Sequence, residues 1–348
     1  MRILVVKRDK LGDLLLTTPV LAHLAAARPG DELHLLANDY NAWVVAGHPA
    51  LARVWVYPRV KHGGRVRIGA ALAHLPLAWQ LSRARFDVAI AMGGEESPRA
   101  IRRSLATGAR RVIGYAADPA GYGTRLTDAL PPPAAGHEVD RMMALLAPLG
   151  VAPPAVVPAP AWTPSAATTD RARGWLAGQG LAPDGFILLG LNARFACKQP
   201  DPAQVARWTA HWQAAWGLPT VLVWTPGRRD DRHYPGDDEL AARVLAQRPP
   251  FVLPHVGSFD QALGLAALAR TTVVPDSGLM HFAAASPGGV LGLFADPARA
   301  GSAERWAPLG PRATFLEAPR AVSGLADDDV HAALAPLAAA PGPARVLR

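Results

Sequence analysis

Short runs of β-branched residues and leucine alternate along the chain with longer amphipathic stretches that are rich in Ala and Leu. This alternation is typical of βαβ units and a parallel sheet. The runs stop near residue 114 and restart after residue 185, which predicts two similar α/β halves. The predicted strands are residues 3–6, 32–37, 53–57, 87–92 and 111–114 in the first half, and 186–191, 220–225, 251–253, 271–275 and 290–294 in the second.

A proline-rich stretch, VAPPAVVPAPAWTP at residues 151–164, separates the two halves. Proline removes backbone donors and favours extended geometry, so we interpret this stretch as an interdomain linker. The length of 348 residues also suits two domains, at roughly 100 to 200 residues each. We expect an N-terminal domain at residues 1–155 and a C-terminal domain at 156–348. A final helix is predicted over residues 327–338, and its packing back on the N-terminal domain is left open.

The chain is basic, with a net charge of +8 and a pI near 10.2. An excess of positive charge suits acidic partners such as phosphates, nucleic acid or anionic lipid. However, 32 arginines stand against only four lysines, and Ala and Pro are abundant. That bias is typical of a GC-rich genome, so genomic composition explains the basicity equally well.

Several classes of protein are disfavoured by the composition and the first residues. The single cysteine, Cys197, excludes an internal disulfide and any zinc site with two or more cysteine ligands. The opening MRILVVKRDKLGD lacks the apolar stretch of a secretory signal, which leads us to expect a cytoplasmic protein. No apolar run approaches the roughly 20 residues of a transmembrane span, so we expect membrane contact to be peripheral at most.

The loop after the first predicted strand, KRDKLGDLLLTTP at residues 7–19, is the first candidate site. In parallel α/β sheets, ligands collect at the carboxyl ends of the strands, where helix N-termini offer free amides to anions. Gly12 allows close approach of the backbone, and Asp13 stands where a helix should begin. An aspartate in that position can equally well serve only to cap the helix.

The second candidate site is PDSGLMHFAAA at residues 275–285. Asp276, Ser277 and Gly278 form a polar turn before a predicted helix, whose first amides can hold a diphosphate. His281 lies one helical turn further on and can reach the same anion. An N-cap at Asp276 or Ser277 and an ordinary helix residue at His281 are the alternatives. Lys198, after the first strand of the second half, offers a compact ammonium that can contact a phosphate as a point charge.

The chain resembles glycosyltransferase family 9, the ADP-heptose:lipopolysaccharide heptosyltransferases, over nearly its whole length. The resemblance rests on GDLLLTTPVL at residues 12–21, HEVDRMMALLAPLG at 137–150, the Lys198 loop, DSGLMHFAAA at 276–285 and LFADP at 293–297. It implies an α/β protein of GT-B architecture, in which two facing Rossmann-like domains hold the active site in an interdomain cleft. The N-terminal domain would then bind the acceptor and the C-terminal domain the nucleotide sugar.

The resemblance also implies the reaction. An inverting enzyme would move a heptose or related sugar from an ADP-sugar to a lipopolysaccharide inner-core-like acceptor, with Asp13 as the general base. No metal and no cofactor would be required, and the sequence shows no DxD-like carboxylate pair at an expected site. The implied partners are the nucleotide-sugar donor and an anionic glycan or glycolipid acceptor, at the cytoplasmic face of the inner membrane. The donor diphosphate would be bound by Lys198, Asp276, Ser277, Gly278 and His281.

Two loops depart from the family pattern. Where the family often has a His-Pro-Gly-like turn, this chain has Asn192-Ala193-Arg194, and where it often has Gly-Gly, the chain reads TPGRRDD at residues 225–231. These loops line the donor site of the family, so the resemblance implies the fold more directly than the nucleotide or the sugar. Asp230 or Asp231 could hold ribose hydroxyls, with a solvated loop acid as the alternative.

Acceptor binding is predicted for the basic loop PRVKHGGRVR at residues 58–67. Basic residues of this region bind phosphates and carboxylates of the acceptor in the family, and a merely solvated loop is the alternative. Nucleic acid fits less well, because the loop lacks interleaved aromatic residues. The candidate acceptor-binding residues are Lys7, Gly12, Arg59, Lys61, Arg65 and Arg67.

Other functions share parts of this sequence pattern. An enzyme of the same family could act on an acceptor other than lipopolysaccharide. A non-catalytic nucleotide-sugar binder could share the paired Rossmann-like domains, although such a binder has no use for a base at Asp13. A nicotinamide-dependent enzyme is disfavoured, because residues 7–12 read KRDKLG where GxGxxG is needed.

Overall fold

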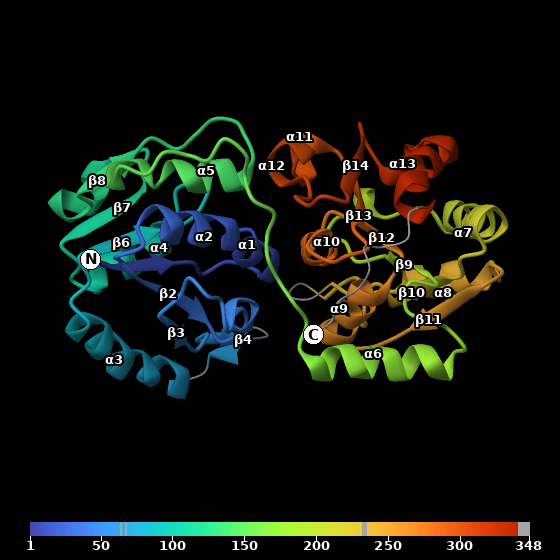
Figure 1. The fold of residues 1–348 in the computed structure, drawn as a ribbon, viewed down its shortest axis with the longest axis horizontal. Helices are drawn as coiled ribbons and strands as arrows, with labels where there is room; N and C mark the ends of the chain where they lie inside the picture. Colours follow the sequence, from blue (N-terminus) through green and yellow to red (C-terminus); the bar gives the residue numbers. More distant parts are fainter. Residues whose placement is uncertain (63–64, 67, 232–234, 340–348) are drawn as a thin grey trace. The chain divides into compact units, whose positions relative to one another are not determined.

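The computed structural model describes residues 1–62, 65–66, 68–231 and 235–339. The chain forms two compact units, Met1–Pro158 and Ala159–Arg348, which run from blue to green and from green to red in Figure 1. Each unit contains a six-stranded parallel sheet with helices packed against it. The α/β class expected from the alternating pattern is confirmed.

The sheet of the first unit has the strand order β3-β2-β1-β6-β7-β8. Strand β1 pairs in parallel with β2 on one side and β6 on the other, so that Ile3 lies opposite Leu33 and Val88. Residues 3–6 are fully buried, as expected for an inner strand of a sheet covered on both faces. The strands are β1 (Arg2–Val6), β2 (Glu32–Asn38), β3 (Arg53–Tyr57), β6 (Val88–Ala91), β7 (Arg111–Tyr115) and β8 (Asp128–Leu130).

Helices flank this sheet, and a short antiparallel hairpin of β4 (Lys61–His62) and β5 (Arg65–Val66) follows β3. Helix α4 packs against β1, β6 and β7, and α2 packs against α5. Helix α3 lies beside the edge strand β3, at the margin of the unit (Figure 1). The helices are α1 (Leu11–Leu15), α2 (Thr18–Ala27), α3 (Ile68–Arg83), α4 (Pro98–Ala106) and α5 (Glu138–Ala144), with 3₁₀ segments η1 (Ala42–Val45), η2 (Pro119–Arg125) and η3 (Ala147–Leu149).

The second unit repeats the plan in the order β11-β10-β9-β12-β13-β14. Strand β9 takes the place of β1 and ends at Gly190, where a Cβ atom would lie only 2.8 Å from Val274 Cγ2 of β12. The strands are β9 (Ile187–Gly190), β10 (Thr220–Val223), β11 (Val252–His255), β12 (Thr271–Pro275), β13 (Val290–Ala295) and β14 (Ala313–Ala318). The helices are α6 (Ala166–Gly178), α7 (Pro202–Trp216), α8 (Asp238–Ala246), α9 (Phe259–Leu268), α10 (Gly278–Ala284), α11 (Pro297–Ala300), α12 (Ala303–Trp306) and α13 (Asp327–Ala339), with 3₁₀ segments η4 (Ala196–Lys198) and η5 (Val322–Gly324).

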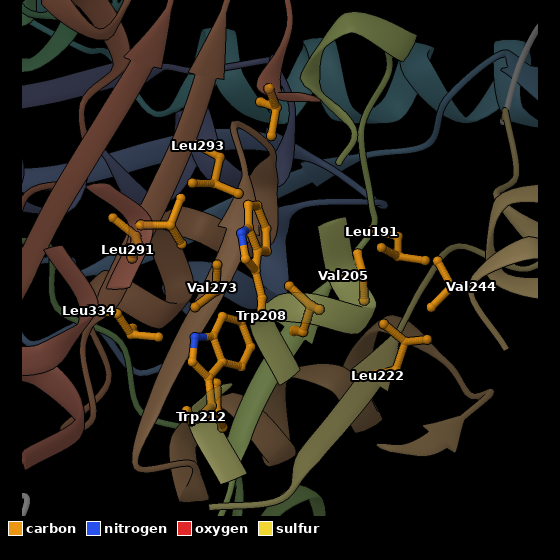
Figure 2. Packing of buried hydrophobic residues seen from close by; sticks show 14 of the residues in the cluster. Leu191, Val205, Trp208, Trp212, Leu222, Val244, Val273, Leu291, Leu293 and Leu334 are labelled. Carbon is orange, nitrogen blue, oxygen red and sulfur yellow. The ribbon is translucent and has the colours of Figure 1, made fainter. Parts of the chain in front are cut away.

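The core of the second unit is built around two tryptophans of α7 (Figure 2). Trp208 and Trp212 are fully buried, and their rings stack with centroids 6.2 Å apart. Val330 and Leu334 of α13 belong to the same core, and α13 packs against α7, β13 and β14. The apolar face of α13 is thus used within the second unit, and packing of this helix on the N-terminal domain, which the sequence left open, stays a prediction.

The predicted strands all occur, and their ends differ from the prediction by at most two residues. The pattern missed β8 and β14, the edge strands next to β7 and β13. Strand β8 has only 3 residues, all half-buried, and β14 mixes half-buried and exposed positions. Neither strand therefore presents the continuous apolar run that marks the inner strands.

Candidate active site

Several of the candidate residues lie where the strand order reverses in each sheet. In the first unit this point lies between β1 and β6, and in the second between β9 and β12. The loops that leave neighbouring strands at such a point run to opposite sides, which opens a crevice at the carboxyl ends of the strands. Lys7 directly follows β1, whereas Lys198 and Asp276 follow β9 and β12.

Lys7 is a buried cation at the carboxyl end of β1. Its side chain is 1% exposed, and Nζ lies 3.2 Å from Asp9 Oδ2 and 3.9 Å from Glu138 Oε1. Burial opposes the charge, but the carboxylates of Asp9, Asp13 and Glu138 outweigh it and raise the pKa of Lys7 above its ordinary value. The lysine therefore stays charged and neutralises acids that converge on this end of the sheet.

Glu138 connects this charge to the strand on the other side of the reversal. It is the first residue of α5, is buried, and accepts a hydrogen bond of 2.8 Å from the amide of Gly94, which follows β6. A Cβ atom at Gly94 would lie 2.2 Å from Glu138 Oε2, so a larger residue there would displace the carboxylate. Glu138 is not among the site residues that the sequence predicts. The sequence signal that could have identified it is an acid at the start of the predicted helix in residues 137–150, a segment that carries part of the family resemblance.

Asp13 is the third residue of α1 and is half-buried. Lys10 is the N-cap of α1, and Asp13 Oδ2 accepts the Lys10 backbone amide at 2.9 Å, so the capping role considered as an alternative is present as the reciprocal half of a capping box. The Thr17 hydroxyl donates to the carbonyl of Asp13 at 2.9 Å. These bonds fix the backbone and orientation of the aspartate, which is what either a cap or a catalytic base requires.

Buried asparagines hold the loop between β1 and α1. Asn38 donates from Nδ2 to the carbonyl of Arg8, and Asn41 donates to the carbonyl of Asp9, each at 2.9 Å. Both asparagines are almost fully buried at the end of β2 and just beyond it. These bonds fix the backbone that leads to Gly12, which is itself buried.

The basic residues predicted to bind the acceptor are described only in part. The amide and Nε of Arg59 both donate to Asp39 Oδ1 at 3.1 Å, and the guanidinium lies 4.5 Å from the centroid of the Tyr40 ring. Lys61 and Arg65 lie in the β4/β5 hairpin, of which only the backbone is described. Arg67 falls outside the described residues.

In the second unit, Lys198 and Asp276 form an ion pair across the reversal of strand order. Lys198 ends η4 in the loop after β9, and its Nζ contacts Asp276 Oδ2 directly after β12. The lysine is 3% exposed. The pair is therefore largely removed from solvent. Two residues that the sequence predicts from separate segments thus lie in direct contact.

The turn after Asp276 leads into α10. Ser277 precedes the helix in an extended conformation and makes no capping hydrogen bond from its side chain. Within the described part of the chain, its buried Oγ has no hydrogen-bond partner. Gly278 begins the helix, and His281 follows one turn later and is 5% exposed. A polar hydroxyl, the first turn of a helix and an imidazole thus belong to the same short segment.

A buried acid that is not among the predicted site residues connects the loops after β9 and β10. Asp237 precedes α8 and accepts bonds from Gln199 Nε2 at 2.6 Å and from Arg229 Nη1 at 3.2 Å. Burial raises the pKa of Asp237 above its ordinary value, although these hydrogen bonds oppose the shift. Arg229 also donates to the carbonyls of Ala193 and Arg194, at 2.7 and 2.9 Å. The two loops that depart from the family pattern are therefore held against each other.

Asp230 and Asp231, the candidates for ribose binding, lie on the surface of the same loop. Asp230 forms a two-point pair with Arg228, at 3.0 and 2.9 Å, and both side chains are exposed. This pair holds the pKa of Asp230 below its ordinary value. No group of three or more His, Cys, Asp or Glu side chains that could hold a metal ion occurs among residues 1–62, 65–66, 68–231 and 235–339.

Comparisons with known proteins agree with this architecture. A model of glycosyltransferase family 9 (heptosyltransferase) matches residues 75–323. The structure of a family 9 glycosyltransferase from Veillonella parvula has a TM-score of 0.80 at 17% identity, covering 97% of each chain. A search of curated proteins finds no match.

Two solved structures from E. coli are also similar. The ADP-heptose lipopolysaccharide heptosyltransferase II has a TM-score of 0.71 at 20% identity, covering 97% of this chain and 99% of that chain. The heptosyltransferase WaaC with ADP has a TM-score of 0.66 at 18% identity, covering 97% of this chain and 100% of that chain. At such identities the likeness establishes the fold, and it confirms the expected GT-B class.

Proposed function

Because the chain belongs to glycosyltransferase family 9, the heptosyltransferases, we propose that it transfers a heptose or related sugar from an ADP-sugar to a lipopolysaccharide inner-core-like acceptor. The proposed transfer inverts the anomeric centre and uses no metal. Structures of similar proteins contain ADP or ADP-2-deoxy-2-fluoro heptose, which supports ADP as the nucleotide. The proposed setting is the cytoplasmic face of the inner membrane, where a nucleotide-sugar pool and a glycolipid acceptor can meet.

The ion pair of Lys198 and Asp276 is the observation that most supports this function. A buried cation at a reversal of strand order is suited to bind an anionic ligand. We assign the donor diphosphate to this position, with Asp276 holding the ammonium of Lys198 in place. The hydroxyl of Ser277, the amide of Gly278 and the imidazole of His281 would complete the set of donors. Such donors stabilise the negative charge that develops on the departing diphosphate.

Asp13 is the proposed general base. The acceptor hydroxyl oxygen attacks the anomeric carbon while its proton passes to the Asp13 carboxylate. The bond between the anomeric carbon and the diphosphate oxygen breaks at the same time, and ADP leaves with the bonding electrons. The acceptor is assigned to the N-terminal domain and the donor to the C-terminal domain, as the family resemblance implies.

The acceptor is assigned to the basic residues of the first unit. Arg59 and Lys7 are positioned at the carboxyl edge of the sheet, and Lys61, Arg65 and Arg67 add positive charge along the sequence. Such a set suits phosphate and carboxylate groups of an inner-core glycan. A family 9 enzyme with another anionic acceptor is the second candidate, since the same charges would serve it.

Calorimetric titration of ADP tests the donor site. We expect ADP to bind in the presence of a chelator, and Lys198→Ala and His281→Ala each to weaken binding about tenfold or more, because each removes a charge-assisted contact. Arg173→Ala, which removes an exposed arginine of α6, is the matched control and should bind ADP like the wild type. Unchanged affinity in both site variants, or loss of binding on chelation, would refute the proposed donor site.

A further inference from the structure

Positive charge is concentrated in one segment of the first unit. Residues 40–86 contain seven of the 36 Lys and Arg residues and none of the 28 Asp and Glu residues. This segment therefore has a net charge of +7, and the remainder of the chain has only +1. Genomic composition raises the arginine content everywhere, so it does not explain why a stretch of this length lacks acids.

Helix α3 lies within this segment and has two apolar faces. His74, Leu77 and Leu81 share one face, because their spacing brings them to the same side of a helix. This face is anchored in the first unit: His74 Nε2 bonds to the Pro58 carbonyl at 2.8 Å, its ring contacts Tyr57, and Leu77 and Leu81 pack on the core.

The opposite face of α3 exposes Leu72, Leu75 and Trp79, which follow the same helical spacing. These side chains are 61%, 69% and 59% exposed, respectively. Single exposed apolar residues are ordinary, but two leucines and a tryptophan on one helix face form a contiguous patch of the kind that marks interaction sites. A helix that is apolar on nearly all sides normally has both faces covered.

Basic side chains border the patch. The guanidinium of Arg83 lies 4.9 Å from the centroid of the Trp79 ring. Arg85 lies two residues further along the chain and is exposed. Tryptophan and arginine side by side suit the boundary between lipid headgroups and acyl chains, where an apolar ring is buried and a cation meets anionic headgroups.

We propose that the exposed face of α3, defined by Leu72, Leu75, Trp79 and Arg83, docks on the surface of an anionic phospholipid bilayer. The bilayer is favoured because its apolar interior can bury the patch while its anionic headgroups meet the bordering Arg83 and Arg85, in a segment of the chain that contains no acid. A nucleic acid would use the charge but leave the leucines in water, and a second copy of the chain would bring two segments of net charge +7 together. The inference does not depend on which sugar the enzyme transfers.

Sedimentation with phospholipid vesicles tests the proposal. The full chain should bind vesicles of equimolar phosphatidylglycerol and phosphatidylcholine, and bind phosphatidylcholine alone much more weakly. Leu75→Gln/Trp79→Gln should weaken binding about tenfold or more, since two apolar side chains are lost. Arg83→Gln should weaken binding to the anionic vesicles by about fivefold and leave binding to phosphatidylcholine unchanged. Val156→Gln, at another exposed apolar residue, is the matched control and should bind like the wild type.

Further measurements separate the possible outcomes. The double variant should keep the melting temperature and ADP affinity of the wild type, because the replaced side chains are exposed, and should keep its rate on a short water-soluble acceptor. Vesicle binding and transfer to that acceptor can thus fail independently. Equal vesicle binding by the wild type and the double variant would overturn the proposal. Sedimentation velocity that shows a wild-type dimer and a monomeric double variant would assign the face to a second copy and overturn it as well.

Discussion

At the scale of single residues, Asp13 is the position that separates an enzyme from a binder. Its contact with the Lys10 amide means that it caps α1 whether or not it also acts as a base. Asparagine can keep the capping bond but cannot accept the proton. We expect Asp13→Asn to retain the melting temperature and ADP affinity of the wild type and to lose about 10²-fold or more in turnover. The measurement is the transfer rate from ADP-heptose to a truncated inner-core acceptor.

A cap elsewhere in the chain provides the control for Asp13. Asp118 accepts the Ala120 amide at the start of η2 and is exposed. Asp118→Asn should therefore leave both stability and turnover unchanged. Near wild-type turnover in Asp13→Asn would assign Asp13 to capping alone, and the base would have to be sought elsewhere.

Lys7 and Glu138 allow a second test at this scale. Removing one member of a buried ion pair leaves the other charge without compensation and costs about 3 to 5 kcal/mol. Lys7→Met should therefore lower the free energy of unfolding by about 3 kcal/mol. Lys7→Met/Glu138→Gln should recover part of that loss, because glutamine is neutral and can still accept the Gly94 amide. Urea denaturation of both variants and of Glu138→Gln completes the cycle, and a double variant less stable than Lys7→Met would contradict this account.

At the scale of elements, a histidine pair joins α7 and α13. His211 and His331 stack with ring centroids 3.8 Å apart and planes 10° from parallel. Burial, and then the neighbouring His211, lower the pKa of His331 below its ordinary value of 6.5. In the unfolded chain the same histidine binds a proton more readily. The stability that it contributes is therefore present above pH 6.5 and is lost as the pH falls through its lower value in the folded protein.

This sign predicts a pH effect on the packing of α13. The wild-type melting temperature should decrease when the pH is lowered from about 7.5 to about 5.5. His331→Gln should reduce that decrease, because glutamine does not titrate. His48→Gln, at another histidine whose pKa burial lowers, shows how much a histidine outside this interface contributes. Identical pH dependence in the wild type and His331→Gln would rule out a role for the stacked pair.

At the scale of the whole molecule, the two units provide a way to locate the donor. A ligand that binds only the folded state stabilises it by about 2.7 kcal/mol at 100 times its Kd. In calorimetry of the full chain, ADP should raise the unfolding temperature of the unit that contains Lys198. Leu334→Ala identifies that unfolding transition because it should lower its temperature, since the Leu334 side chain is fully buried in the core of the second unit. Ile101→Ala marks the first unit in the same way, and an ADP shift confined to that transition would exclude donor binding by the second unit.

Much of the site could be predicted from local sequence. Lys198 and Asp276 were identified because each follows an apolar run, and parallel strands bring their carboxyl ends to one edge of the sheet. Asp237 and Glu138 could not be found in this way. Their roles depend on contacts with Gln199 and Gly94, which lie 38 and 44 residues away along the chain. Acids whose role depends on such long-range contacts cannot be told from ordinary loop or helix-terminal acids in the sequence.

The sequence alone determined the α/β class, the inner strands and the division into halves, because the alternation of apolar runs and amphipathic stretches reports burial locally. Only the tertiary structure decided the rest. It places β8 and β14 at the sheet edges, where half-exposed strands lack an apolar pattern, and it directs α13 into the core of the second unit. It also leaves one apolar face of α3 exposed, since the spacing of Leu72, Leu75 and Trp79 reports a helix face but not what covers it.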